Sequence, residues 1–387
     1  MINAASTLAD AQGEFETIPF NKAVSLGSEA DRIAQALRGQ ACGNGPFGRR
    51  CEQILGELLG CQALVVSSAT AALELAALLL EIKPGDEVII PSFTFVSTAN
   101  AFLLRGAKLL FADVDASGNL DPREVSRLRS ARTRAIVPVH YAGGSCDMDE
   151  LRSAAEGIAI VEDAAQAIGA SFRGVPLGTF GSCGAISFHE TKNVGCGEGG
   201  ALIVRDSSLL ERARCLRDKG TDRHRFEQGL CDKYTWVDVG TSPLLAELSA
   251  AWLSVQLESL GRIQARREEI WARYLAELEG PAERAGVAVV RGHPKGRGNA
   301  HLFALVFRTG DERRRFVAHT RAMGISTPPH YVALHTSPLG RRLHDGQPLP
   351  WSERLSSCLA RLPLFFNLPD GAVARVIDAT LDFLVTL

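Results

Sequence analysis

Several features that mark other classes of protein are missing from this sequence of 387 residues. The 42 lysines and arginines are nearly balanced by 44 aspartates and glutamates, so the net charge is −2 and we expect no nucleic-acid partner. No apolar run reaches membrane-spanning length, since even residues 71–80 are interrupted by Glu74. Residues 1–20 carry Asp10 and Glu14 and lack the apolar core of an export signal, so we expect a cytoplasmic protein.

The nine cysteines form no C-x-x-C pair, and most lie in apolar surroundings, as Cys183 and Cys358 do. Scattered thiols of this kind are typical of a reducing compartment. Histidines and cysteines do not cluster at the spacings of zinc ligands, so we expect no metal. No G-x-G-x-x-G follows a predicted strand, which argues against a nicotinamide-dependent dehydrogenase.

What the sequence does contain is an alternation of short apolar runs with amphipathic stretches. The predicted strands are Ala63–Ser67, Glu87–Ile90, Lys108–Val114, Arg134–His140, Ile158–Glu162, Gly184–Phe188 and Ala201–Val204. The predicted helices among them are Thr70–Ile82, Thr94–Leu104 and Asp147–Ala155. Strands separated by helices need crossover connections, so the pattern predicts an α/β fold with a mostly parallel sheet.

The chain divides into three predicted parts: a polar tail at residues 1–17, a large domain at 18–260 and a smaller α+β domain at 261–387. The elements expected near and after the boundary are a helical stretch at Leu244–Leu278, a break at Pro281 and around residues 292–298, a strand at His301–Phe307 and a helix at Val373–Leu384.

Polar residues follow three of the predicted strands, where an open parallel sheet binds its ligands. Residues 67–70 (SSAT) open a helix, and free N–H groups there suit a phosphate, although the same residues suit an ordinary helix cap. Asp163 ends a very apolar strand and would be costly to bury without a cation such as a pyridinium, although a carboxylate at a helix start is an alternative. Lys192 precedes the glycines of residues 197–200 and suits Schiff-base chemistry, although most lysines are simply exposed.

Taken together, a phosphate cradle, a pyridinium partner and a reactive lysine occur in the order used by pyridoxal enzymes of the aspartate-aminotransferase fold. The segments SSATAAL, PSFTFVSTANA, PVHYAG, VEDAAQA and SFHETKN…GEGG resemble the DegT/DnrJ/StrS family of sugar aminotransferases. The stretches DKYTW and RLPLFFNL are similar to its dTDP-4-amino-4,6-dideoxygalactose transaminases. The resemblance implies pyridoxal-phosphate-dependent transferase fold type I.

The resemblance also implies a role for each residue near the cofactor ring. Lys192 forms the aldimine with pyridoxal 5′-phosphate and later moves the proton, and Asp163 pairs with the pyridine nitrogen. Gln166 lies near the phenolic oxygen, and Phe95 stacks on the ring, although core packing is an alternative for this phenylalanine.

Further residues are implied for the phosphate and the substrate. The phosphate is held by Ala69, Thr70 and Ser187. Ser242 stands where the family often has an asparagine that reaches the phosphate of the other subunit, so a homodimer with shared sites is expected. Ala69 stands where the family usually has glycine, and a backbone N–H contact survives that change. Tyr331 and His335 are candidates for the sugar pocket.

The implied reaction is the transfer of an amino group from L-glutamate to C4 of a dTDP-linked 4-keto-6-deoxy hexose. A 3-ketosugar aminotransferase is an alternative within the family. A sugar dehydratase of the family would carry histidine in place of Lys192, and a non-catalytic regulator would not need to retain Lys192, Asp163 and Gln166 together.

Overall fold

The computed structural model describes residues 17–39 and 42–387. The polar tail predicted for residues 1–17 lies, apart from Thr17, outside these ranges. Within them, no helix combines the length and the apolar character needed to cross a membrane.

A mixed sheet of seven strands forms the centre of the described chain, in the order β1-β9-β8-β5-β4-β2-β3. Its strands are β1 (Gln62–Val66), β2 (Glu87–Pro91), β3 (Lys108–Ala112), β4 (Thr133–Ile136), β5 (Ala159–Asp163), β8 (Cys183–Ser187) and β9 (Gly200–Val204). β9 runs antiparallel to both of its neighbours, β1 and β8, and the remaining pairs are parallel. The predicted α/β class with a mostly parallel sheet is therefore confirmed.

Helices cover both faces of this sheet, because successive residues of each strand point to opposite sides. One face packs against α2 (Pro46–Leu59), α5 (Pro122–Leu128), α6 (Met148–Ala155) and α9 (Glu247–Glu258). The other face packs against α3 (Ala69–Leu79), α4 (Val96–Leu103) and α7 (Leu210–Arg217). In β1, Ala63 and Val65 join the first core while Leu64 and Val66 join the second. Burial on both faces explains why the strands read as continuous apolar runs.

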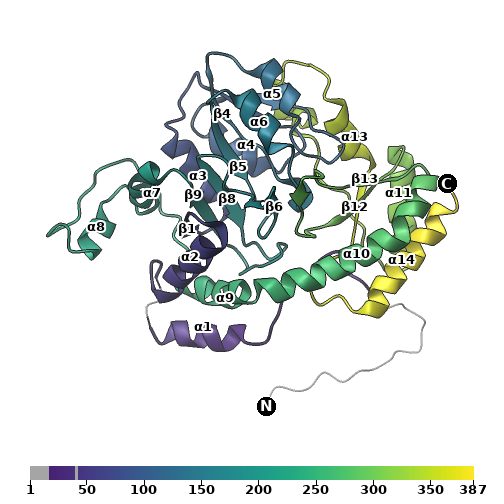
Figure 1. Cartoon of the computed structure of the whole chain (residues 1–387), viewed down its shortest axis with the longest axis horizontal. Coiled ribbons are helices and arrows are strands. Elements are labelled where there is room, and N and C mark those ends of the chain that lie inside the picture. Colours follow the sequence, from purple (N-terminus) through teal and green to yellow (C-terminus); the bar gives the residue numbers. More distant parts are fainter. Residues whose placement is uncertain (1–16, 40–41) are drawn as a thin grey trace.

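The C-terminal part has a core of its own, shared by Ile18 near the start of the described chain. Its antiparallel sheet has the order β10-β12-β13 and contains β10 (Ala288–Val289), β12 (Phe303–Val306) and β13 (Leu359–Leu362). Its helices are α10 (Leu260–Arg284), α11 (Gly310–Ala322), α12 (Gly340–Leu343), α13 (Pro350–Cys358) and α14 (Asp370–Leu384). Figure 1 shows α10 as the long helix that joins α9 to this end of the molecule, with α14 beside it. The domain boundary near residue 260 stays a prediction.

Three smaller features lie outside the two main sheets. A small sheet joins β6 (Ser171–Phe172) and β7 (Val175–Pro176) to β11 (Gly296–Arg297), so the segment after α10 reaches back to the large sheet's loops. α1 (Glu29–Leu37) packs on α9, and α8 (Arg223–Glu227) lies on a segment that projects from the body (Figure 1).

The break predicted at Pro281 is wrong, because α10 continues through this residue to Arg284. Proline lacks an N–H and costs a helix one hydrogen bond. Here Leu278 and Ala282 are buried in the C-terminal core on either side of it, and this packing keeps the last turn helical. The helical stretch predicted from Leu244 is instead two helices, which meet at Ser259.

Candidate active site

The parallel strands β1, β2, β5 and β8 end at the same edge of the sheet, and a cavity of about 540 Å³ lies there. Eight of the ten residues predicted for the cofactor and substrate line it: Ala69, Thr70, Phe95, Asp163, Gln166, Ser187, Lys192 and Tyr331. They come from positions more than 260 residues apart in the chain, and the sheet topology brings them together.

The start of α3 forms one wall of this cavity. The Ser68 hydroxyl caps the helix by accepting a hydrogen bond from the Ala71 N–H over 3.1 Å. The Thr70 hydroxyl lies 2.7 Å from the Ser97 hydroxyl of α4, so two helix starts present their hydroxyls together. A Cβ at Gly200 would stand 2.4 Å from the Ala69 nitrogen, so only glycine lets β9 approach this turn. The unpaired N–H groups of a helix start suit an anion such as a phosphate.

Asp163 ends β5 and is buried at the base of the cavity. Its Oδ2 accepts a hydrogen bond from the Thr98 hydroxyl over 2.7 Å, and its Oδ1 accepts one from the Ala165 N–H over 3.2 Å. Burial raises the pKa of this carboxyl, while the two hydrogen bonds and the charge of Lys192 oppose the rise. A buried carboxylate in this state favours a cationic partner, and a protonated pyridine nitrogen is such a partner.

Lys192 lies in the loop after β8 and lines the same cavity as Asp163. Burial lowers the pKa of its ammonium to about 8, although the charge of Asp163 acts in the opposite direction and Arg361 lowers it further. A lysine of this pKa has an appreciable neutral fraction near pH 7.5, and only the neutral amine attacks a carbonyl.

The loop that carries Lys192 is fixed by close backbone packing. The Phe188 N–H donates to the Gly199 carbonyl, and a Cβ at Gly195 would stand 2.9 Å from the His189 oxygen. Asn193 is buried beside Lys192, where its Nδ2 donates to the Asn299 carbonyl over 2.8 Å and its Oδ1 lies 2.9 Å from His301 Nδ1. The loop is therefore tied to the C-terminal part of the chain.

The oxygen and the nitrogen of the Gln166 side-chain amide both form hydrogen bonds within the protein. Its Oε1 accepts a hydrogen bond from the Ala142 N–H over 2.8 Å, and its Nε2 donates to the Tyr331 hydroxyl over 2.9 Å. Ala142 has a left-handed φ of 59°, and its N–H donates to Gln166 from this turn. Phe95 is 54% exposed at the cavity, and its ring centroid is 6.3 Å from that of Tyr331. This exposure speaks against the core-packing alternative for Phe95.

Comparisons with known proteins agree with this geometry. Residues 26–381 match the model of the DegT/DnrJ/EryC1/StrS aminotransferase family. The chain belongs to this family. It is similar to DesV from S. venezuelae, solved with a ketimine intermediate, with 34% identity, a TM-score of 0.85 and coverage of 96% of this chain and 99% of that one. It is also similar to the aminotransferase TlmJ from Streptoalloteichus hindustanus, with 29% identity, a TM-score of 0.88 and coverage of 96% and 100%.

A third similar structure is a DegT DnrJ EryC1 StrS aminotransferase from Brucella abortus, with 29% identity, a TM-score of 0.82 and coverage of 92% and 95%. The family assignment confirms fold type I of the pyridoxal-phosphate-dependent transferases. It also confirms that the chain is an enzyme, a transaminase, and that its cofactor is pyridoxal 5′-phosphate. The roles of individual residues remain predictions that the cavity geometry supports.

Two residues implied by the family resemblance lie outside the cavity. Ser242 is exposed, next to Pro243, whose carbonyl accepts a hydrogen bond from the Ser67 N–H at the end of β1. His335 is buried, with its Nδ1 2.6 Å from the Ser92 hydroxyl and its Nε2 3.3 Å from Glu353. His335 therefore supports the loop after β2 rather than facing a substrate, whereas Tyr331 lines the cavity.

Several side chains at the candidate active site were not predicted from the sequence. Thr98 and Ser97 lie in the segment PSFTFVSTANA, which carries the resemblance, but nothing in the sequence alone shows that α4 turns them toward Asp163 and Thr70. Asn193 follows Lys192 directly and could have been suspected as an anchor for that reason.

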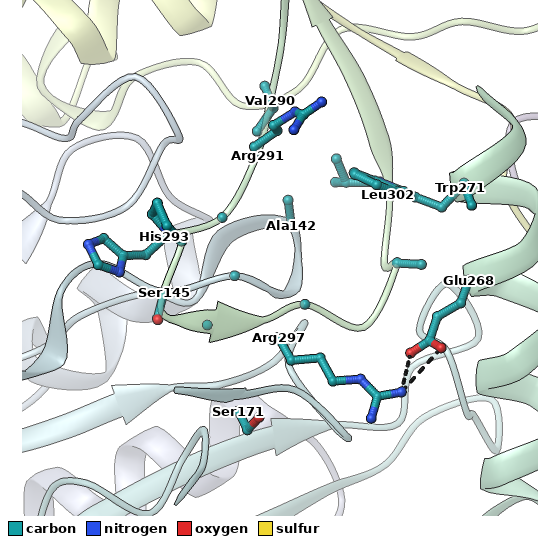
Figure 2. Close-up of a pocket in the computed structure, with 17 residues that line it drawn as sticks. Ala142, Ser145, Ser171, Glu268, Trp271, Val290, Arg291, His293, Arg297 and Leu302 are labelled. Carbon is teal, nitrogen blue, oxygen red and sulfur yellow. Dashed lines mark hydrogen bonds and ion pairs between the residues drawn. The ribbon is translucent and has the colours of Figure 1, made fainter. Parts of the chain in front are cut away.

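A further cavity of about 430 Å³ lies between α10 and the segment that carries β11 (Figure 2). Its ionisable side chains already have partners: Arg297 pairs with Glu268, Arg291 with Glu279, and His293 lies 3.5 Å from Asp147. The cavity contains none of the predicted site residues. The cavity at the strand ends is therefore the better candidate for the active site.

Proposed function

We propose that this enzyme transfers the amino group of L-glutamate to C4 of a dTDP-linked 4-keto-6-deoxy hexose and so produces a 4-amino-4,6-dideoxy sugar nucleotide. The family assignment supports an aminotransferase. The choice of a sugar, of C4 and of dTDP follows from the resemblance of the sequence motifs to the dTDP-4-amino-4,6-dideoxygalactose transaminases.

One observation carries the proposal: Lys192 and Asp163 line a single cavity whose other wall is the start of α3. An aldehyde needs an amine with a lowered pKa, a pyridinium needs a buried carboxylate, and a phosphate needs free N–H groups. The three groups of pyridoxal phosphate thus find three matching partners among this chain's own residues. When bound, the cofactor supplies a conjugated ring that stores the electron pair released by the amino donor.

The residues around the cavity then have distinct tasks. The Lys192 amine would hold the cofactor covalently and, once free of it, would move the proton from the donor carbon that bears the nitrogen to the cofactor carbon that receives the nitrogen. Asp163 keeps the pyridine nitrogen protonated, and Thr98 holds that carboxylate in place. Gln166 and Phe95 line the cavity and would orient the ring. Ala69, Thr70 and Ser187 hold the phosphate.

We also propose that the enzyme acts as a homodimer. The segment that carries α8 projects from the body (Figure 1) and exposes large apolar side chains, namely Phe226, Leu230, Trp236, Val237 and Val239. Single exposed apolar residues are normal, but several on one projecting segment are typical of a surface that another chain covers. Ser242 follows this segment and is exposed, as a residue that completes the partner's phosphate site would be.

The proposal is tested by incubating the purified enzyme with L-glutamate and dTDP-4-keto-6-deoxyglucose and recording NMR spectra of the product. We expect an amino group at C4 and an equivalent amount of 2-oxoglutarate. The Lys192→Ala variant provides the control and should form no product. An amino group at C3, or a deoxygenated sugar without nitrogen, would contradict the proposal and favour the corresponding alternative within the family.

A further inference from the structure

A small cavity of about 220 Å³ also borders Lys192, and none of the residues that line it belongs to the start of α3. It shares Gln166, Thr191, Lys192 and His330 with the larger cavity, so the lysine borders both spaces. A molecule in the small cavity would therefore lie next to the reactive amine without occupying the phosphate cradle.

Arg361 reaches this small cavity from β13. Its Nη2 donates to the Pro329 carbonyl over 2.9 Å, and the guanidinium lies over the ring of Phe20 at 4.2 Å. Its Nε is enclosed and has no hydrogen-bond partner. Among the described residues no carboxylate pairs with this guanidinium, whereas the buried Arg217 pairs with Glu52 and the buried Arg267 donates to two carbonyls. An enclosed charge without a counterion is unfavourable.

The other groups around the small cavity leave this positive charge uncompensated. Within the described chain, no aspartate or glutamate lines it. His301 and His330 do line it, and burial together with the charges of Lys192 and Arg361 holds the pKa of both well below the usual value, so both are neutral. Tyr141 and Tyr331 face Arg361 from the neighbouring segments and carry no charge at neutral pH. The space is therefore suited to an anion.

We propose that Arg361 binds a carboxylate of the amino donor and so selects an amino acid as the donor substrate. Guanidinium and carboxylate form short, paired hydrogen bonds, and the free Nε offers one of the donors. The anion is a carboxylate rather than the diphosphate of the sugar nucleotide, because about 220 Å³ is below the roughly 300–1,000 Å³ of pockets that enclose drug-sized ligands. The inference rests on the proposed use of L-glutamate as the amino donor and makes Arg361 a specificity-determining residue.

Measuring the two half-reactions separately distinguishes binding of the amino donor by Arg361 from binding of the sugar nucleotide. The first half is followed by the change in cofactor absorbance when L-glutamate alone is added to the full-length holoenzyme. The second half is followed with enzyme loaded with pyridoxamine phosphate, to which only the keto sugar nucleotide is added. Arg361→Gln should raise the KM for L-glutamate roughly 10- to 100-fold, as expected for loss of a charge-assisted hydrogen bond, and leave the KM for the keto sugar nucleotide unchanged.

Matched variants make the outcome decisive. Arg361→Lys keeps the charge and should fall between the wild type and Arg361→Gln, and glutarate should inhibit the first half-reaction of the wild type more strongly than that of Arg361→Gln. Arg284→Gln, an exposed position at the end of α10, should behave as the wild type.

An unchanged KM for L-glutamate in Arg361→Gln would overturn the inference, and an equal rise in the KM for the sugar nucleotide would assign the anion to the diphosphate instead. Wild-type holoenzyme that does not respond to L-glutamate would contradict the proposed donor itself, which is a different result from a variant that responds as well as the wild type.

Discussion

The hydroxyl of Thr98 donates a hydrogen bond of 2.7 Å to Oδ2 of Asp163, across a distance of 65 positions in the chain. Thr98 lies in the first turn of α4, and its own oxygen is 2.9 Å from the Thr94 hydroxyl. This arrangement fixes the rotation of the carboxylate and lowers its pKa against the effect of burial. The orientation and the charge of Asp163 therefore depend on the hydroxyl of Thr98.

We expect Thr98→Val to lower kcat roughly tenfold, because a hydrogen bond to a charged group is lost while the volume is kept. The pKa of Asp163 should rise further, so the acid limb of the kcat profile should move to higher pH. Thr98→Ser keeps the hydroxyl and serves as the control. A Thr98→Val profile that overlays the wild type would show that Asp163 does not depend on this contact.

Lys192 makes formation of the holoenzyme dependent on pH. Its amine is protonated below about pH 8 and neutral above it, so the rate at which cofactor-free enzyme reacts with pyridoxal phosphate should rise through that pH and then level off. Stopped-flow absorbance measures this rate. Lys192→Ala should give no such absorbance change, and a wild-type rate that stays constant across this range would contradict the lowered pKa.

Glu162 should contribute to stability rather than to chemistry. This fully buried carboxylate accepts hydrogen bonds from the N–H groups of Gly178, Phe180 and Gly181, and lies 2.8 Å from His140 Nε2. Glu162→Gln replaces one acceptor oxygen with a donor and leaves buried N–H groups unsatisfied. We expect a loss of about 2–4 kcal/mol in the free energy of unfolding, measured by denaturant titration.

The matched control for Glu162 is Glu283→Gln, an exposed change near the end of α10 that should be neutral. If Glu162→Gln unfolds at the same denaturant concentration as the wild type, the hydrogen bonds to this carboxylate carry little net stability.

The proposed dimer depends on the projecting α8 segment. Trp236 is 78% exposed on it, and Trp236→Asp should raise the dimer dissociation constant at least roughly tenfold, because exposed aromatic residues dominate interfaces. Sedimentation velocity measures the shift toward monomer, and activity should fall with it. Val385→Asp changes an equally exposed apolar residue, 85% accessible at the C-terminal helix, and should leave the dimer intact. A wild type that sediments as a monomer would contradict the shared site.

Much of the large sheet could be predicted from its sequence, because its strands are buried on both faces and so read as apolar runs. Asp163 and Lys192 could be placed near each other because one ends β5, the other follows β8, and these two strands run parallel. The predicted role of His335 has no support, since a buried histidine and one that faces a substrate look the same in sequence. The role proposed for Arg361 could not be predicted from the sequence. It depends on the cavity that Arg361 of β13 shares with Lys192, which lies 169 positions earlier in the chain.

The end of α10 and the long-range contacts of Asn193 were also not predicted from the sequence. Pro281 signals a break, and the packing of Leu278 and Ala282 outweighs that local preference. The pairing of Asn193 with residues 299 and 301 joins segments more than 100 positions apart, and no periodicity or motif encodes such a contact.

The central claim is that Lys192 carries the cofactor. It is tested most directly by treating the purified holoenzyme with borohydride, which turns a Schiff base into a stable secondary amine, and locating the modified residue by peptide mass spectrometry. The account predicts a single phosphopyridoxyl group on Lys192 and none in protein that was first depleted of cofactor. A label on another lysine, or a holoenzyme that borohydride leaves unlabelled, would contradict it.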